Sequence, residues 1–162
     1  MNAIDFLLIS YLAFDDLMPG NRLLNTRVYF LNIKTRLNFE YYQTFYGPYS
    51  GLVESENLRL KDLRAISMVA VERGSGGFER WRRVYNLTEY GKTLAWKVQE
   101  SHAEIFANLN HTAGIIGISE DYMMMCAAAK MHYEPTASKL GFEISGDQLN
   151  AALDLIKRLD NS

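Results

Sequence analysis

Residues 67–88 read SMVAVERGSGGFERWRRVYNLT, and this stretch decides the fold. Hydrophobic and polar residues alternate over 67–73 and again over 78–87, as they do in strands with one buried face. The glycine-rich run GSGG separates the two arms, and such a turn between alternating runs predicts a β-hairpin. Most of the remaining chain has helical spacing, so we expect a mainly α-helical protein with a small β-hairpin.

An aromatic stretch, YYQTFYGPYSGL at residues 41–52, precedes the hairpin. Its glycine and proline make it neither a good helix nor a good strand. Pro48 favours extended backbone at Gly47, and Ser50 belongs to the residue types that cap helix N-termini. We therefore predict a helix from residue 51 to about 65, with the tyrosines packed around its start.

Two more helices are predicted before the aromatic stretch. The first covers 3–17, and the Met-Pro-Gly run that follows ends it because proline cannot continue a helix. The second covers 21–35. In the helix that starts at residue 51, Leu52, Leu60 and Leu63 are predicted to share the core-facing side, with Val53 adjoining.

Three helices are predicted after the hairpin. Thr88 is the expected N-cap of the first, and Ser119 is the expected N-cap of the second, which Pro135 ends. The expected helices cover residues 89–110, 120–133 and 147–160. The succession helix, helix, helix, strand, turn, strand, helix is the order of a winged helix-turn-helix domain.

Two motifs carry this similarity further. The run YGPYS at 46–50 and the run VYNLTEYGK at 84–92 resemble patterns of PadR-like and MarR-like winged-helix proteins. The chain also resembles a group of uncharacterised archaeal winged-helix proteins and, more weakly, Panacea-type antitoxin domains. The resemblance covers about residues 3–92, so we expect a winged-helix domain over 1–91 and a helical extension over 92–162.

The resemblance implies a DNA-binding surface. In these families the third helix enters the major groove, and the hairpin, or wing, contacts the backbone or the minor groove. The DNA-binding residues implied on the third helix are Tyr49, Ser50, Ser55, Asn57, Arg59 and Lys61, with Glu54 among them. Those implied on the wing are Arg73, Arg80, Arg82 and Arg83.

The distribution of charged residues favours DNA contact by the wing more than by the third helix. Residues 72–83 hold four arginines against two glutamates, and arginines neutralise phosphates. Residues 50–65 hold three basic and three acidic residues, with two of the acids before the first basic residue, and the whole chain has a net charge of −2. Duplex DNA is therefore the first expected partner. The alternative is that the chain is an antitoxin-like interaction module, which binds another protein and does not bind DNA.

The helical extension is expected to mediate homodimerisation, because winged-helix regulators commonly pair through such helices and a two-fold dimer presents two wings to two half-sites. The run MMMC at 123–126 predicts adaptable core packing. A groove between these helices for an apolar effector is the alternative to that interpretation.

Enzyme activity is not expected. The three histidines, His102, His111 and His132, match no common metal-ligand spacing. The GSGG turn lacks the lysine of a phosphate-binding loop. We therefore predict no catalytic residues, no metal site and no cofactor.

The composition favours a cytoplasmic protein. A single cysteine, Cys126, excludes an intramolecular disulfide and fits a reducing compartment. The apolar runs are shorter than the roughly 18 residues of a membrane span. The first residues carry aspartates where a signal peptide has a basic start, so we expect no membrane partner.

Overall fold

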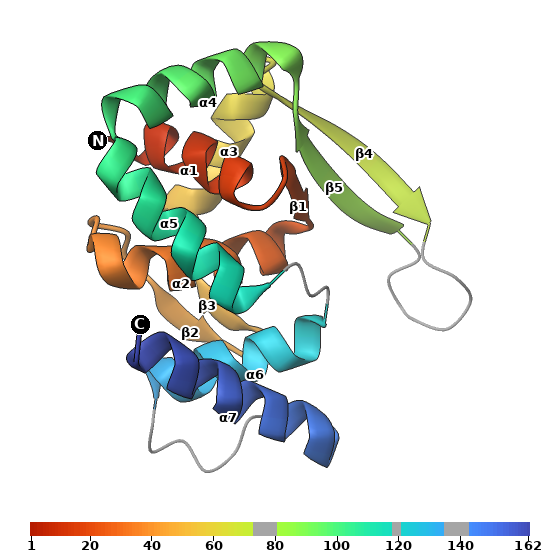
Figure 1. Cartoon of the computed structure of the whole chain (residues 1–162). Helices are drawn as coiled ribbons and strands as arrows, with labels where there is room; N and C mark the ends of the chain where they lie inside the picture. The colour runs from red at the N-terminus through yellow and green to blue at the C-terminus, as the bar shows by residue number, and fades with distance from the viewer. Residues whose placement is uncertain (73–80, 118–120, 135–142) are drawn as a thin grey trace.

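A computed structural model describes residues 1–72, 81–117, 121–134 and 143–162 of the chain. In these ranges the chain is mainly helical and carries two small antiparallel sheets (Figure 1). The elements are α1 (Ala3–Ala13), β1 (Leu17–Pro19), α2 (Asn21–Thr35), β2 (Tyr42–Thr44), β3 (Gly47–Tyr49), α3 (Gly51–Asp62), β4 (Ile66–Glu72), β5 (Trp81–Leu87), α4 (Glu89–Ser101), α5 (Ala103–Ile116), α6 (Tyr122–Tyr133) and α7 (Gly146–Asp160).

The expected pairing of the alternating arms is confirmed in the described residues. Strands β4 and β5 pair antiparallel, with Val69 opposite Val84, and the GSGG turn lies outside the described residues. The short strand β1 adds a third strand that we did not expect, in the order β1-β5-β4. Pro19 is compatible with β1 because an edge strand can lack one amide donor.

The aromatic stretch also forms strands, which corrects our expectation of an irregular segment. Tyr42 lies opposite Tyr49 in the β2–β3 pair, with ring centroids 5.2 Å apart. Gly47 has φ 106°, which a glycine adopts without strain. The hydroxyl of Thr44 donates to the Gly47 carbonyl oxygen at 2.8 Å and closes the turn.

Several helices end where the backbone turns left-handed. Helix α1 stops at Ala13, four residues before the expected end, and Asp15 and Asp16 follow with φ 52° and 66°. Helix α3 stops at Asp62, three residues before the expected end, with Arg64 at φ 58°. Polar residues tolerate this conformation better than β-branched ones.

The prediction of one continuous helix over 89–110 is wrong. It breaks at His102, whose φ of −135° and ψ of 44° are not helical, and α5 starts at the next residue. The break lets α4 pack on α1 while α5 contacts both α1 and α2. Tertiary packing therefore overrides a continuous helical pattern.

The core-facing side of α3 also differs from the expected one. Val53, Asn57 and Leu60 are buried, whereas Leu52 and Leu63 are 40% and 51% exposed. The buried positions follow the three- and four-residue spacing of one helix face. The expected burial is therefore confirmed for Leu60 and for the adjoining Val53, and it is wrong for Leu52 and Leu63.

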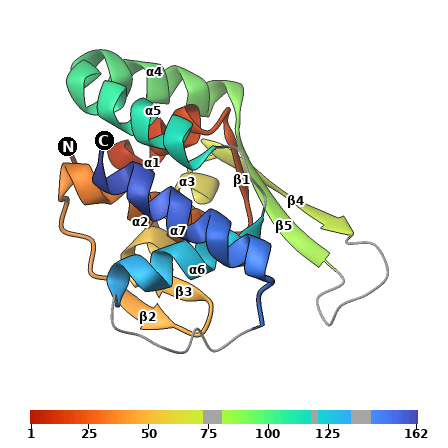
Figure 2. The ribbon, with the colours of Figure 1, turned by 60° about the horizontal axis from the view of Figure 1, so that its bottom comes forward.

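The C-terminal helices fold back onto the N-terminal half. Helix α6 packs on β3 and α2, and α7 lies on α6 (Figure 2). Buried residues of the predicted segments 1–91 and 92–162 belong to one hydrophobic cluster. Met124, Met125 and Cys126 lie in the interior, in agreement with the predicted core packing.

Helices α6 and α7 begin with caps that we did not predict. Asp121 is the N-cap of α6 and accepts a hydrogen bond from the Met124 amide at 3.1 Å. The predicted Ser119 cap and the Pro135 stop lie outside the described residues. Helix α7 agrees with the expected 147–160 helix and begins with a capping box between Ser145 and Gln148.

Candidate nucleic-acid interface

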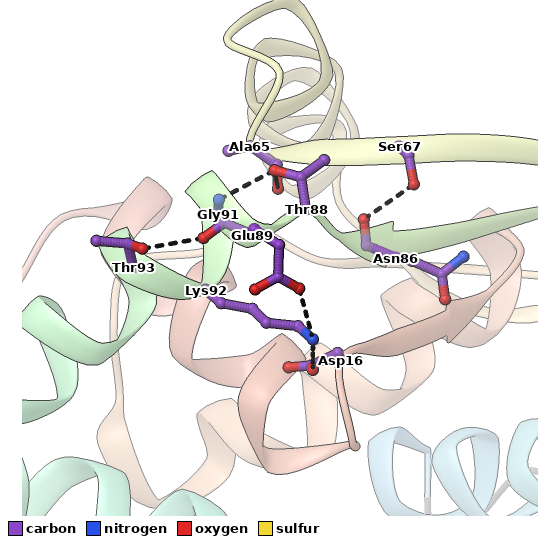
Figure 3. A network of polar contacts seen from close by, with 9 residues as sticks. All are labelled: Asp16, Ala65, Ser67, Asn86, Thr88, Glu89, Gly91, Lys92 and Thr93. Atoms are coloured by element: carbon purple, nitrogen blue, oxygen red, sulfur yellow. Dashed lines mark hydrogen bonds and ion pairs between the residues drawn. The ribbon is translucent and has the colours of Figure 1, made fainter.

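The junction between β5 and α4 sets the position of the sheet against the helices (Figure 3). Thr88 caps α4 as predicted, because its Oγ1 accepts a hydrogen bond from the Gly91 amide at 3.0 Å. The same hydroxyl lies 2.8 Å from the Arg64 carbonyl oxygen and 3.1 Å from that of Ala65. One threonine therefore joins the start of α4 to the turn that follows α3.

Gly91 allows this close approach. A Cβ atom at this position would lie 1.9 Å from the carbonyl oxygen of Ala65. Any side chain would push α4 away from the α3–β4 turn, since that distance is far below van der Waals contact. The glycine of the VYNLTEYGK run thus has a steric role in this fold.

Lys92 connects this junction to Asp16, in the turn that precedes β1 (Figure 3). Its Nζ lies 3.2 Å from Asp16 Oδ2 and 3.3 Å from Glu89 Oε1. Hydrogen bonds to Asp16, and next to Glu89, raise the pKa of Lys92 above its usual value. The Asp16 carbonyl also accepts the Leu87 amide at 3.0 Å, so this turn contacts both β5 and α4.

The start of α3 is held from inside the molecule. Ser50 is fully buried and occupies the N-cap position, but its hydroxyl makes no capping bond and has no hydrogen-bond partner among the described residues. Its amide instead donates to Asn25 Oδ1 at 2.9 Å. The predicted side-chain cap is therefore wrong, and burial removes Ser50 from any surface that could contact DNA.

Asn57 is also buried and does not face solvent. Its Oδ1 accepts a hydrogen bond from the Tyr11 hydroxyl at 2.7 Å. Burial raises the pKa of Tyr11 well above its ordinary value, and the nearby Tyr85 adds to this. Asn57 thus satisfies a buried hydroxyl between α1 and α3, in place of the expected contact with a base.

The two acids in the first half of α3 are engaged within the chain. Glu54 accepts hydrogen bonds from Tyr49 and from Asn21 Nδ2, the latter at 3.1 Å. Glu56 is half-buried, and its Oε2 lies 3.6 Å from Arg59 Nη1. Glu54 is therefore hydrogen-bonded within the protein, whereas Glu56 has an ion-pair contact with Arg59 and its Oε2 accepts no hydrogen bond from the described residues.

Three of the predicted third-helix residues are exposed: Ser55, Arg59 and Lys61. Tyr49 is half-buried at the start of the helix. The Arg59 side chain is 65% exposed in spite of its contact with Glu56. The exposed residues of the predicted set are therefore one hydroxyl and two cations, and the exposed Asp62 adds an acid to the same helix.

The β4–β5 hairpin contributes two of the predicted cations to the described structure. Arg83 is exposed and Arg82 is half-buried, and they point to opposite sides of β5 because neighbouring strand residues alternate. Arg82 lies opposite Val71, and Arg83 lies opposite Ala70. Arg73 and Arg80 lie outside the described residues.

Two residues near this surface were missed by the sequence prediction. Asn21 links three elements, because its Oδ1 accepts the Tyr85 hydroxyl at 2.6 Å while its Nδ2 contacts Glu54. Arg22 is exposed, with its guanidinium 3.6 Å from the centre of the Tyr46 ring. The aromatic stretch was a signal for Arg22, since arginines often stack on tyrosines, but no sequence pattern identified Asn21.

The histidines occupy separate places. The Tyr29 hydroxyl lies 2.7 Å from His132 Nδ1 between α2 and α6, His102 lies at the helix break, and His111 is exposed on α5. Across the described ranges, no group of three or more histidine, cysteine or acidic side chains could hold a metal ion. Nor does any helix in those ranges have the length and apolar character to cross a membrane.

Comparisons with known proteins do not assign the chain to a family. A scan against protein-family models finds no match to the chain, and a search of the curated proteins finds none either.

Proposed function

We propose that the chain is a winged helix-turn-helix protein that binds duplex DNA as a transcription regulator. The observation that carries the proposal is the β1-β5-β4 sheet joined to the end of α3 through Thr88 and Gly91. This junction combines a wing with a helix that has one solvent-exposed side. The order of elements supports the same conclusion.

Electrostatics at this surface also support DNA binding. Arg59, Lys61 and Arg83 are exposed, and such cations gain affinity for DNA by releasing phosphate counterions. The early acids of α3, which weaken the case when only the sequence is considered, have intrachain partners at Glu54 and Glu56. Ser55 is the exposed hydroxyl near the helix start that could read a base edge.

The double substitution Arg82→Ala/Arg83→Ala tests the proposal. We expect weaker binding to every duplex sequence, because phosphate contacts carry no sequence information. The slope of log K against log salt should fall by about 2 if each arginine neutralises one phosphate. Fluorescence anisotropy with a random duplex, measured across a salt series, gives both quantities.

The matched control is Lys157→Ala/Arg158→Ala on α7. It removes the same charge from exposed positions on a different element. Binding by this control should equal that of the wild type. If the wing variant binds as tightly as the control, and with the same salt slope, the proposed contact is wrong.

A second candidate is a protein-interaction module that keeps this fold without binding DNA. The exposed side of α3 carries Leu52, Leu58 and Leu63, which are 40%, 46% and 51% exposed. Apolar residues on one exposed surface are typical of protein contacts. A wild-type protein that fails to shift random duplex DNA even at low salt would favour this candidate.

A further inference from the structure

Strand β4 forms an open edge of the three-stranded sheet. The strand order is β1-β5-β4, so β4 pairs with β5 on one side and with no described strand on the other. The β4–β5 hairpin projects away from the helices (Figure 1). Both faces of β4 are accessible, since residues 67–72 are all exposed. Another chain can therefore reach the backbone of β4 along this edge.

The hydrogen-bonding pattern shows which backbone groups of β4 point outward. The Thr88 amide donates to the Ala65 carbonyl oxygen at 2.9 Å, and these two residues lie opposite each other when the β4–β5 register is extended by one pair. Opposed pairs in an antiparallel ladder alternate between pairs that exchange hydrogen bonds and pairs that do not. Val69 therefore bonds to β5, whereas the N–H and C=O groups of Met68 and Ala70 point away from it.

The two edges of the sheet differ in their protection against further pairing. Strand β1 has three residues and contains Pro19, which lacks an amide donor. The run MVAV at 68–71 in β4 has neither proline nor charge, although natural proteins commonly protect an exposed edge with one of these. Val69 and Val71 are 52% and 44% exposed, and β-branched residues favour strands. The β4 edge is therefore suited to accepting a further strand.

We propose that β4 binds an extended segment of a partner protein, which adds to the sheet as an antiparallel strand. The segment has a carboxylate residue opposite Ala70 and apolar residues opposite Val69 and Val71. In this mode of recognition, main-chain hydrogen bonds supply affinity and alternate side chains supply specificity. The proposal does not rest on DNA binding, because peptide binding is measured without DNA.

Arg83 is the reason for the acid in this pattern. It is exposed and lies opposite Ala70 in the β4–β5 pair, so the two side chains are on the same face of the sheet. A residue added opposite Ala70 shares that face and lies about 10 Å from Arg83, which is two strand spacings of about 4.8 Å each. The small side chain of Ala70 leaves room between them, and an arginine and a glutamate side chain together span this distance.

Backbone methylation of a synthetic peptide tests the mode of binding. The probe is a fluorescent peptide with a central glutamate between two valines. In the proposed register the glutamate amide donates to the Ala70 carbonyl oxygen, whereas the valine amides point away from β4. N-methylation of the glutamate should weaken binding about tenfold, because it removes a main-chain hydrogen bond. N-methylation of one valine is the matched control and should change the affinity by less than about twofold. Fluorescence anisotropy with the wild-type chain measures both affinities.

Charge reversal tests the register. Arg83→Glu should weaken binding of the glutamate peptide about fivefold, on the scale of an exposed ion pair that becomes a repulsion. A peptide with lysine in place of the glutamate should bind this variant about as tightly as the glutamate peptide binds the wild type. Lys157→Glu, at an exposed position on α7, is the matched control for net charge and should leave the affinity of the glutamate peptide unchanged. Circular dichroism of both variants ensures that lost binding is not lost folding.

Three results would overturn the proposal. One is a glutamate peptide that shows no saturable binding at any concentration up to its solubility limit. Another is equal affinity of the two methylated peptides for the wild-type chain. The third is a wild-type dimer in which the amides of Met68 and Ala70 are protected from hydrogen exchange without peptide, because a second copy would then occupy the edge.

Discussion

Single residues in this protein differ in how closely the surrounding backbone restricts them. Gly91 has a backbone oxygen where a side chain would begin. Gly114, in the exposed part of α5, has no atom within 4 Å of the corresponding position. The two glycines therefore respond in opposite directions to the same substitution.

Gly91→Ala should destabilise the protein by about 3 kcal/mol, because a Cβ 1.9 Å from the Ala65 oxygen forces α4 to move. Gly114→Ala is the matched control and should stabilise the fold by about 0.5 to 1 kcal/mol, since alanine is the better helix former. Urea unfolding measures both changes. Equal effects of the two substitutions would contradict the role of Gly91 as a contact glycine.

Arg36 is the second residue-scale test. It ends α2 in the left-handed conformation, with φ 51°. Arg36→Gly should raise the free energy of unfolding by about 0.5 to 1 kcal/mol, because glycine adopts this conformation without a Cβ clash. Lys34→Gly, two residues earlier inside the helix, should lower it by about 1 kcal/mol. Thermal unfolding that ranks the two variants in the reverse order would exclude this explanation.

At the scale of elements, most helix starts follow local chemistry, and most unexpected features follow long-range contacts. Thr88 and Ser145 cap helices through hydrogen bonds to amides three residues away. The break at His102 and the strand β1 instead depend on α1, α2 and β5. A three-residue strand has too few positions to show a period, so no pattern in the sequence predicted β1.

At the scale of the whole molecule, α2 is the element that joins the two halves. Its Tyr29 packs against Tyr41, His132 and Tyr133, and the Tyr29 hydroxyl contacts His132. Burial raises the pKa of Tyr29 to about 12, with Tyr133 adding to the shift. Burial also raises the pKa of Tyr41 well above its usual range.

The raised pKa values of these tyrosines predict that the protein loses stability at alkaline pH. A tyrosine with a raised pKa in the folded state stays protonated there while the unfolded chain ionises near its ordinary pKa of 10.0. The contribution of Tyr29 to the free energy of unfolding should therefore be constant below pH 10 and should decrease from about pH 10 to about 12. Tyr29→Phe should show a shallower decrease over that interval in urea unfolding at each pH. An unchanged slope would contradict a buried, protonated Tyr29.

The sequence by itself determined the features that depend on near neighbours. These are the paired arms of the hairpin, the Thr88 cap, the second helix and the last helix. Alternation and capping act over a few residues, so their signal is present in the order of residues. The resemblance to winged-helix families implied Ser55, Arg59, Lys61 and Arg83 as candidates, and these four residues are exposed in the structure.

Only the tertiary structure decided which side of each element is buried and how the halves meet. Ser50 and Asn57 have residue types suited to DNA contact, yet Asn25 and Tyr11 hold them in the interior. Gly91 is required because of Ala65, which lies 26 positions earlier in the chain. Burial and steric contact depend on residues that are distant in sequence, and a pattern read along the chain does not contain them.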